Sequence, residues 1–201
     1  MPIFETGPAG LILTALIAYL LGSIPFGLVL TRVFNLGDLR KIGSGNIGAT
    51  NVLRTGNKAA AAATLVLDAA KGAVAVLIAR AAFAEDAVQL AALMALLGHC
   101  FPVWLRFKGG KGVATFLGVL LALSFPVGLA ACGTWLVFAL VSRISSIGAL
   151  GAAASAPVWM LFLGGSRMFV LGVVMTALVI LRHRTNIQRI MAGTESQIGR
   201  K

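Results

Sequence analysis

Residues 43–54 read GSGNIGATNVLR and form the most polar stretch of an otherwise apolar neighbourhood. Glycine lets a backbone approach a ligand closely because it has no Cβ, and successive N–H groups in such a turn form an anion-binding nest. Arg54 adds a planar guanidinium that can bind a phosphate through two hydrogen bonds. We therefore expect a phosphate-binding loop, whose candidate contacts are Ser44, Gly45, Asn46, Gly48, Thr50, Asn51 and Arg54.

The spacing of Gly43, Gly45 and Gly48 also fits the dinucleotide-binding pattern G-x-G-x-x-G. That pattern requires a strand before it and a βαβ unit around it. The preceding residues are instead the end of a long apolar segment that predicts a helix, so we exclude a dinucleotide site. The remaining alternative is a flexible polar turn between two helices.

A second stretch of similar character, GHCFPVWLRFKGGKGVAT, covers residues 98–115. Glycines surround Lys111, and a new helix is predicted to begin near Val113. The free N–H groups at a helix N-terminus favour an anion. The segment is not a Walker loop, because Gly112 follows the lysine where Ser or Thr is required. Nucleotide hydrolysis is therefore unsupported.

A third stretch, RHRTNIQR at residues 182–189, is followed by Gly193-Thr194-Glu195. If the helix before it continues, His183 and Asn186 lie on one face. A histidine between two arginines and close to an asparagine predicts a ligand-binding group rather than a structural one. The alternative for the arginines is contact with anionic lipid head groups.

Asp68 and Lys71 are a candidate intramembrane pair, because they lie three residues apart within an apolar segment. Charges inside a membrane are costly, face the interior of the helix bundle and usually pair. Two interpretations stay open at this point. The pair is purely structural, or Lys71 also faces the bound anion.

The residues that are missing exclude several reaction classes. Only Asp38, Asp68 and Glu195 are expected inside the cell or within the membrane, which argues against paired-carboxylate hydrolysis and acidic Mg²⁺ sites. The H-x-x-x-x-D pattern of acyl-CoA-dependent acyltransferases is absent, since Trp104 and Gln188 stand five residues after the two histidines. No Cys, His and carboxylate cluster has metal-site spacing. We expect neither a metal nor another cofactor.

Composition defines the elements that must position these residues. The 201 residues are 59% hydrophobic and 11% charged, with a mean hydropathy of +0.96, whereas soluble domains are ~25% charged. We predict one all-α integral-membrane domain over residues 1–201 with about seven membrane spans. The predicted spans cover residues 10–34, 59–83, 87–104, 113–123, 127–141, 147–163 and 168–182.

Charge resolves the ambiguous stretch 113–141, which can be one long span or two short ones. With two spans and the N-terminus outside, all Lys and Arg except Lys71, Arg80 and Arg167, 14 of 17, lie inside or at the inner span ends. With one span, Arg143 and the basic tail move outside, against the positive-inside rule. Two spans also bring every polar motif to the cytoplasmic face. The net charge of +11 thus indicates membrane topology and an anionic ligand rather than nucleic acid.

Together, the stretches 43–54, 98–115 and 183–186 with Gly193-Thr194-Glu195 resemble the bacterial integral-membrane glycerol-3-phosphate acyltransferases that use acyl phosphate. Gly22–Gly27 and Asp68-x-x-Lys71-Gly72 are similar to that family as well. The resemblance implies seven membrane helices, an outside N-terminus and a place in the bacterial inner membrane. It implies acyl transfer to the 1-hydroxyl of glycerol 3-phosphate, giving lysophosphatidate and phosphate. The implied partners are glycerol 3-phosphate, long-chain acyl phosphate and membrane lipid, with the monomer as the working unit.

The resemblance also implies roles for single residues. Ser44, Asn46 and Arg54 would hold a phosphate, and Lys111 would bind the phosphate of glycerol 3-phosphate. The implied catalytic set is Ser44, Lys111, His183 and Asn186. A serine of the turn at residues 142–146 also belongs to the site, and we favour Ser146 while its neighbour Ser145 stays open. A substrate phosphate is the favoured base, with His183 as an orienting donor, and His183 itself is the alternative base.

A different class of function is a transporter or flippase for a small phosphorylated metabolite, which a basic, glycine-lined site would also serve. Transporters usually show internal repeats with a binding site at the membrane midplane. No repeat is visible in this sequence, and the motifs are predicted on one face. We therefore favour the enzyme.

Overall fold

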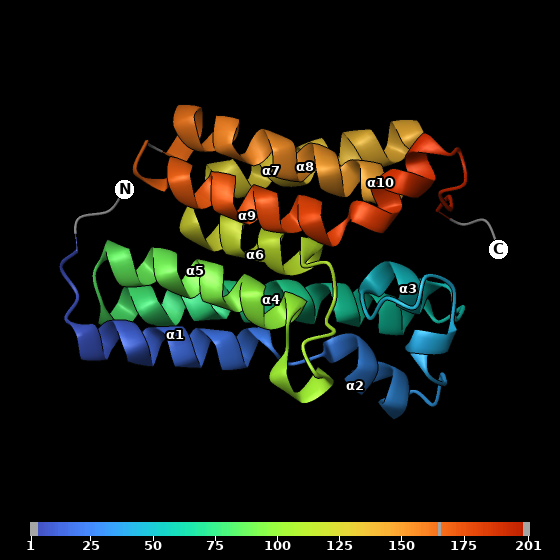
Figure 1. Cartoon of the computed structure of the whole chain (residues 1–201), viewed down its shortest axis with the longest axis horizontal. Helices are drawn as coiled ribbons and strands as arrows, with labels where there is room; N and C mark the ends of the chain where they lie inside the picture. Colours follow the sequence, from blue (N-terminus) through green and yellow to red (C-terminus); the bar gives the residue numbers. More distant parts are fainter. Residues whose placement is uncertain (1–3, 165, 199–201) are drawn as a thin grey trace.

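The computed structural model describes residues 4–164 and 166–198, and these residues form helices and loops without a β-strand (Figure 1). The α-helices are α1 (Pro8–Gly22), α2 (Phe26–Val33), α3 (Ala49–Leu53), α4 (Lys58–Ala82), α5 (Glu85–Cys100), α6 (Val113–Leu123), α7 (Phe125–Ser142), α8 (Ser145–Trp159), α9 (Phe169–Arg182) and α10 (Arg184–Met191). A π-helical turn, Met160–Gly164, extends α8, and 3₁₀ turns cover Leu39–Lys41, Val103–Leu105 and Ser166–Met168. The predicted all-α membrane fold is confirmed.

The first predicted span is one apolar segment that is interrupted by a break at Ser23–Pro25. Together α1 and α2 cover Pro8–Val33, 26 residues with a mean hydropathy of 2.1. Proline has no N–H to continue the helical ladder, and Pro25 caps α2. The hydroxyl of Ser23 donates to the Tyr19 carbonyl oxygen at 2.7 Å, so this side chain serves helix packing.

The predicted division of 113–141 into two helices is confirmed, because α6 and α7 are separated at Ser124. Within the described residues, five helical segments are long and apolar enough to cross a membrane. A sixth forms if Ser166–Arg182 and Arg184–Met191, which meet at 61°, are one span. With its 11 residues, α6 is a shorter apolar helix. The total of seven spans and the outside N-terminus stay predictions.

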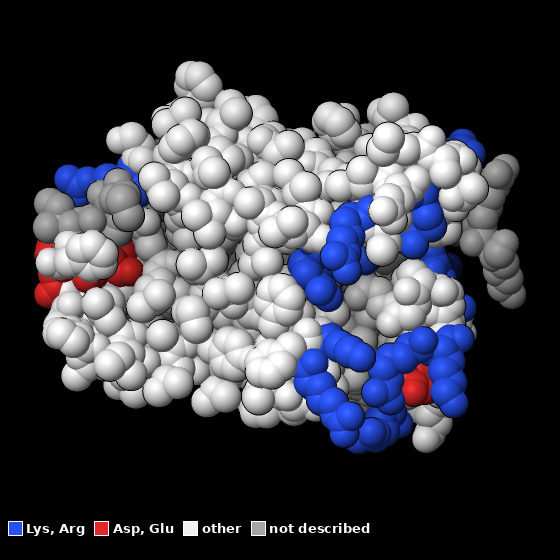
Figure 2. All heavy atoms as spheres, in the orientation of Figure 1, with Lys and Arg blue, Asp and Glu red and all other residues white. Residues whose placement is uncertain are grey.

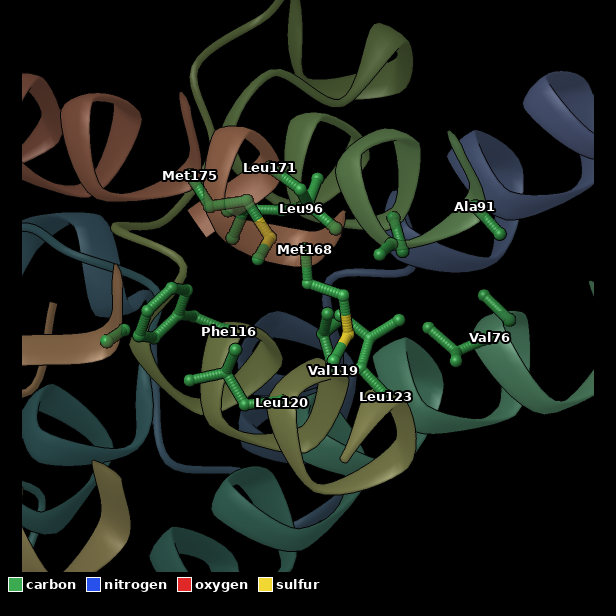
Figure 3. Packing of buried hydrophobic residues seen from close by; sticks show 14 of the residues in the cluster. Val76, Ala91, Leu96, Phe116, Val119, Leu120, Leu123, Met168, Leu171 and Met175 are labelled. Atoms are coloured by element: carbon green, nitrogen blue, oxygen red, sulfur yellow. The ribbon is translucent and has the colours of Figure 1, made fainter. Parts of the chain in front are cut away.

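Although α6 is short, its neighbours enclose it. Phe116, Val119 and Leu120 are at most 1% exposed and lie opposite Met175 of α9 and Leu96 of α5 (Figure 3). Helix association within a membrane depends on close packing rather than on the hydrophobic effect. Shielding by surrounding helices is what a helix too short for the bilayer needs.

The charged side chains gather at the two ends of the bundle. In Figure 2 most Lys and Arg lie at the end that carries α2, α3 and α10 in Figure 1, while the opposite end shows Asp and Glu. The flanks between these ends show few charged side chains in this view (Figure 2). Large apolar side chains such as Leu65, Val66 and Phe138 are exposed on the surface of the bundle. This distribution is the one expected of a bundle surrounded by lipid.

Candidate active site

The side chain of Asn51 holds the first loop, residues 43–54, in shape through hydrogen bonds to the backbone. This side chain is buried, and its amide nitrogen donates to three backbone carbonyl oxygens, those of Leu39 (3.0 Å), Ile42 (3.0 Å) and Asn46 (2.8 Å). Its Oδ1 accepts the N–H of Ser44 at 3.3 Å and Arg54 Nη1 at 3.4 Å. The sequence predicts Asn51 as a substrate ligand, whereas the structure uses its hydrogen bonds to shape the loop.

Two glycines let the first loop turn sharply beside Arg54. Gly43 and Gly45 have φ of 51° and 69°, values that residues with a side chain rarely adopt. A Cβ on Gly43 would lie 2.5 Å from Arg54 Nη1, so the guanidinium packs directly against the glycine backbone. The loop thus brings backbone and guanidinium together, as the predicted phosphate-binding loop requires.

The second loop, residues 101–112, is held by Arg182 at the end of α9. Arg182 Nη2 donates to the Gly109 carbonyl oxygen at 2.9 Å, and Nε donates to that of Gly110 at 3.1 Å. Its guanidinium also lies over the Phe101 ring, 5.1 Å from the centroid. Lys111 follows Gly110 directly, so Arg182 also fixes the position of the Lys111 backbone. We had expected Arg182 only at the end of a membrane span. No spacing rule reveals this contact, since the two partners are 72 and 73 residues away from Arg182.

His183 lies at the bend between α9 and α10. The helix does not continue straight through this point, because α9 and α10 meet at 61°. His183 and Asn186 are nevertheless both buried, at 2% and 3% exposure. His183 Nδ1 lies 2.8 Å from the Val179 carbonyl oxygen and must donate to it, because a carbonyl can only accept. In the neutral imidazole, Nε2 is then the acceptor.

The tail after α10 joins the elements of the site through Glu195. Its Oε1 accepts hydrogen bonds from Ser146 Oγ at 2.8 Å and from the Asn186 amide, and its Oε2 accepts from Arg189 Nε at 2.6 Å. Arg54 of the first loop donates to the hydroxyl of Ser196. The tail thereby connects the first loop, α8 and α10. The sequence indicated Glu195 as part of a motif and as one of few cytoplasmic carboxylates, but not this bridging position.

Lys111 lies within the electrostatic field of these groups. Burial lowers the pKa of its amine to about 8, because it disfavours the charged form. The carboxylate of Glu195 opposes that change, whereas the cations Arg189, Arg54 and Arg182 add to it. A site that holds several cations around one partly buried lysine is prepared for a strongly charged anion.

Ser145 and Thr50 lie together but apart from these contacts. Their hydroxyl oxygens are 3.2 Å apart, and they connect α3 to the first turn of α8. Asn46 Oδ1 accepts the N–H of Ile47, the next residue along the chain, and Gly48 caps α3. For these predicted ligands the structure provides a place in or beside the first loop, and their roles toward a substrate stay predictions, as do those of Ser44 and Gly45.

The predicted intramembrane pair is present, with Lys71 Nζ 2.8 Å from Asp68 Oδ1 and both side chains 3% exposed. Lys71 Nζ also donates to the Ile24 carbonyl oxygen at 2.7 Å. These contacts favour the structural interpretation over an anion-facing Lys71.

Among the described residues, no group of three His, Cys, Asp or Glu side chains could hold a metal ion.

A pocket of about 380 Å³ lies beside the second loop and is lined by Arg40, Trp104, Leu105, Arg106 and Lys108. None of the predicted site residues lines it. The indole N–H of Trp104 donates to the Ser23 carbonyl oxygen at 2.7 Å. This hydrogen bond fixes Trp104 as one wall of the pocket.

Comparison with known proteins places this chain in a family. The family model of glycerol-3-phosphate acyltransferase matches residues 12–193. A glycerol-3-phosphate acyltransferase of Cereibacter sphaeroides is 66% identical over 201 residues, which are 100% of this chain and 96% of that protein. One of Ruegeria pomeroyi is 64% identical over 201 residues, 100% of this chain and 99% of the relative.

Solved structures agree with this match. The crystal structure of the integral membrane glycerol 3-phosphate acyltransferase PlsY in its glycerol 3-phosphate form is 40% identical, with a TM-score of 0.89 over 94% of this chain and 96% of that one. The lysophosphatidic acid form of the same protein gives 39% identity and a TM-score of 0.86, covering 94% and 95% of the two chains. The predicted family resemblance is confirmed: this chain belongs to the glycerol-3-phosphate acyltransferase family.

Proposed function

We propose that this protein transfers a fatty acyl group from a long-chain acyl phosphate to the 1-hydroxyl of glycerol 3-phosphate in the bacterial inner membrane. The observation that carries the proposal is the convergence of Arg54, Lys111 and His183 from two loops and the bend between α9 and α10, since Arg54 and His183 both lie within the electrostatic reach of Lys111. The 40% identical relative has been solved in forms named for glycerol 3-phosphate and for lysophosphatidic acid, the acceptor and the product of this reaction.

The two phosphates of the substrates are assigned to different loops. Lys111, with the free N–H groups at the start of α6, binds the phosphate of glycerol 3-phosphate. The first loop, through Ser44, Asn46 and Arg54, holds the phosphate of the acyl donor. Asn186 and Ser146 complete the acceptor site, supported by their shared contact with Glu195.

The protein needs to supply little covalent chemistry, because acyl phosphate is a mixed anhydride with a good leaving group. The 1-hydroxyl oxygen forms a bond to the acyl carbon, the bond from that carbon to the phosphate oxygen breaks, and its electron pair leaves with phosphate. The hydroxyl proton passes to a substrate phosphate. Catalysis is then mainly positioning and stabilisation of negative charge, which suits a site rich in cations and poor in carboxylates.

His183 orients glycerol 3-phosphate in this scheme. We expected His183 as an orienting donor, but the contact of Nδ1 with Val179 leaves Nε2 of the neutral ring as an acceptor. Nε2 then accepts from the 2-hydroxyl of glycerol 3-phosphate, which orients the molecule and leaves the proton of the 1-hydroxyl for the substrate phosphate. We expect His183→Gln, whose side-chain amide reaches the Nε2 position, to keep more activity than His183→Ala. An equal and complete loss in both variants, with glycerol 3-phosphate still bound, would assign the base to His183 instead.

The proposal is tested by acyl transfer to radiolabelled glycerol 3-phosphate in detergent. Purified protein receives palmitoyl phosphate, palmitoyl-CoA or a palmitoyl thioester of acyl carrier protein in parallel. Labelled lysophosphatidate from palmitoyl phosphate alone supports both the reaction and the donor. Product from a thioester overturns the donor assignment. No product from any donor, with the label still bound, overturns the enzyme and makes a sealed-vesicle transport assay the next experiment.

We infer further that one chain is the working unit and that residues 1–201 act as a single domain. A hydrogen bond from Arg54 in the first loop to Ser196 in the tail supports the single domain, because it joins residues 142 positions apart in the chain. Active monomers in nanodiscs that hold one copy each would agree with it, and activity restricted to dimers would contradict it.

A further inference from the structure

The proposed chemistry leaves a group of buried polar side chains unused, and this group lies within the membrane-spanning helices. Asp68 and Lys71 of α4 are in ion-pair contact at 2.8 Å. His99, near the end of α5, has its Nδ1 3.7 Å from Asp68 Oδ1. His99 Nδ1 has no hydrogen-bond partner among the described residues, so this carboxylate is its polar neighbour. Charges are costly at such a depth and indicate a function by default.

One end of this group is attached to the break between α1 and α2. Lys71 Nζ donates to the Ile24 carbonyl oxygen at 2.7 Å and lies 5.7 Å from the centroid of the Phe26 ring. The same carbonyl oxygen accepts the N–H of Phe26 at 3.1 Å, so Lys71 is its second partner at the helix break. Lys71 therefore fixes this break relative to α4.

The other end lies directly against the second loop. A Cβ on Gly110 would fall 2.2 Å from His99 Nε2, and the next nearest atoms, at 3.0 and 3.1 Å, belong to the same imidazole. The N–H of Gly110 also donates to the His99 carbonyl oxygen at 3.1 Å. The φ of Gly110 lies outside the left-handed region, so its backbone would accept an alanine. The imidazole is thus what fills the space beside Gly110.

Arg182 holds the same peptide from a different helix. Its Nε donates to the Gly110 carbonyl oxygen at 3.1 Å, while His99 packs against the Cα of that residue. Gly110 therefore contacts both His99 of α5 and Arg182 of α9, and the residue that follows it is Lys111. A small shift of this peptide would move the lysine amine.

We propose that Asp68, Lys71 and His99 are positioning residues that fix the Gly110 peptide, and thereby Lys111, for binding of the glycerol 3-phosphate phosphate. The inference rests on the proposed function, in which Lys111 binds that phosphate. Asp68 is the polar neighbour of the imidazole at 3.7 Å, Lys71 neutralises Asp68 and anchors the pair to Ile24, and the imidazole supports the loop. Simple helix packing at this point is already provided by Thr115, whose hydroxyl donates to the Asp68 carbonyl oxygen at 2.8 Å.

The first test separates positioning from stability through the two Michaelis constants. His99→Ala should raise the KM for glycerol 3-phosphate by about tenfold or more, because misplacement by about 1 Å is costly in a catalytic site. The KM for palmitoyl phosphate should stay within about twofold, since the first loop is untouched. Gln89→Ala is the matched control, because Gln89 is buried near the other end of α5. Equal changes in both constants, or the same change in the control, would overturn the proposal.

The second test is a double-mutant cycle across the contact itself. Gly110→Ala introduces a methyl group where the imidazole stands, so its KM for glycerol 3-phosphate should rise. Because His99→Ala removes the obstructing ring, adding Gly110→Ala to it should cost little more, and the two effects should be strongly non-additive. Gly109→Ala is the control, since its Cβ would meet the backbone oxygen of His99 at 2.2 Å, which His99→Ala leaves in place. Multiplicative effects in both cycles would contradict the inferred contact.

A third variant separates this inference from the proposed function. Lys111→Ala is measured for glycerol 3-phosphate binding by calorimetry in the same detergent. Unchanged affinity would overturn the role of Lys111, whatever His99 does. Lost affinity combined with a normal KM in His99→Ala would overturn only the positioning network. If His99→Ala does not yield folded protein, His99→Asn replaces it, because the amide keeps a polar group near Asp68 and removes the ring atoms that meet Gly110.

Discussion

Ser146 Oγ donates a 2.8 Å hydrogen bond to Glu195 Oε1, which joins the first turn of α8 to the tail that follows α10. The same oxygen accepts the amide of Asn186. Ser145, one residue earlier, lies instead beside Thr50. The structure thus supports Ser146 as the serine of the candidate site and makes Glu195 the residue through which α8 and α10 are connected.

Replacing Glu195 with glutamine should weaken both the fold and the activity. The carboxylate accepts from three donors, whereas a glutamine keeps one acceptor oxygen and turns an NH₂ group toward the remaining donors. An unsatisfied buried partner costs about 1–3 kcal/mol, so Tm in detergent should fall by several degrees. Asp38→Asn, at an exposed ion pair with Arg40, is the control and should leave Tm unchanged. Equal Tm values for the two variants would argue against the bridging role.

The acid stability of the protein should depend on the same carboxylate. Burial raises the pKa of Glu195, but hydrogen bonds from Arg189, Asn186 and Ser146 outweigh it and hold the pKa below the usual value. The stabilisation is therefore present above the pKa of the unfolded chain and is lost as pH falls through the lower folded pKa. Wild-type Tm should decline more steeply below about pH 4 than that of Glu195→Gln, because the variant has no proton to take up at this position. Parallel pH profiles would contradict this origin.

Arg182→Lys should raise the KM for glycerol 3-phosphate by about tenfold, although it keeps the charge. A lysine cannot reproduce the fork that binds two adjacent carbonyl oxygens, so the loop before Lys111 would lose its fixed position. Arg184→Lys is the matched control, because Arg184 is exposed two residues further along. Steady-state kinetics with each substrate varied in turn would measure the two KM values in both variants. A KM for glycerol 3-phosphate that is unchanged in Arg182→Lys would show that the second loop holds its shape without the fork.

Residue type and spacing predicted the three polar segments, because these depend on local chemistry, and the distribution of Lys and Arg along the chain predicted the division of 113–141. Contacts that join distant segments were not predictable in this way. Arg182 and the Gly109 carbonyl oxygen, or Ser146 and Glu195, are paired only after the helices pack. The bend at His183 escaped prediction for a related reason, since neither glycine nor proline marks it in the sequence.

The pH dependence of catalysis should report Lys111. With its pKa lowered to about 8 by burial, the amine loses its charge as pH rises above that value. The log of kcat/KM for glycerol 3-phosphate should therefore fall with a slope of about −1 above pH ~8. Lys111→Arg keeps its charge over this range, so the alkaline fall should move to higher pH even if the maximal rate is lower. An unchanged profile in Lys111→Arg would assign the titration to another group.

Close packing of α4 and α6 should make Gly118 far less replaceable than another helical glycine. A Cβ on Gly118 would lie 2.1 Å from the Ala69 carbonyl oxygen, so Gly118→Ala must separate two helices whose backbones are in contact. Tm should drop by several degrees, and activity should fall because α6 begins directly after Lys111 and Gly112. Gly133→Ala on α7 is the matched control. Nothing lies within 4 Å of a Cβ there, and alanine is the better helix former by about 1 kcal/mol, so Tm should hold or rise. Similar losses in the two variants would mean that the contact between α4 and α6 can relax.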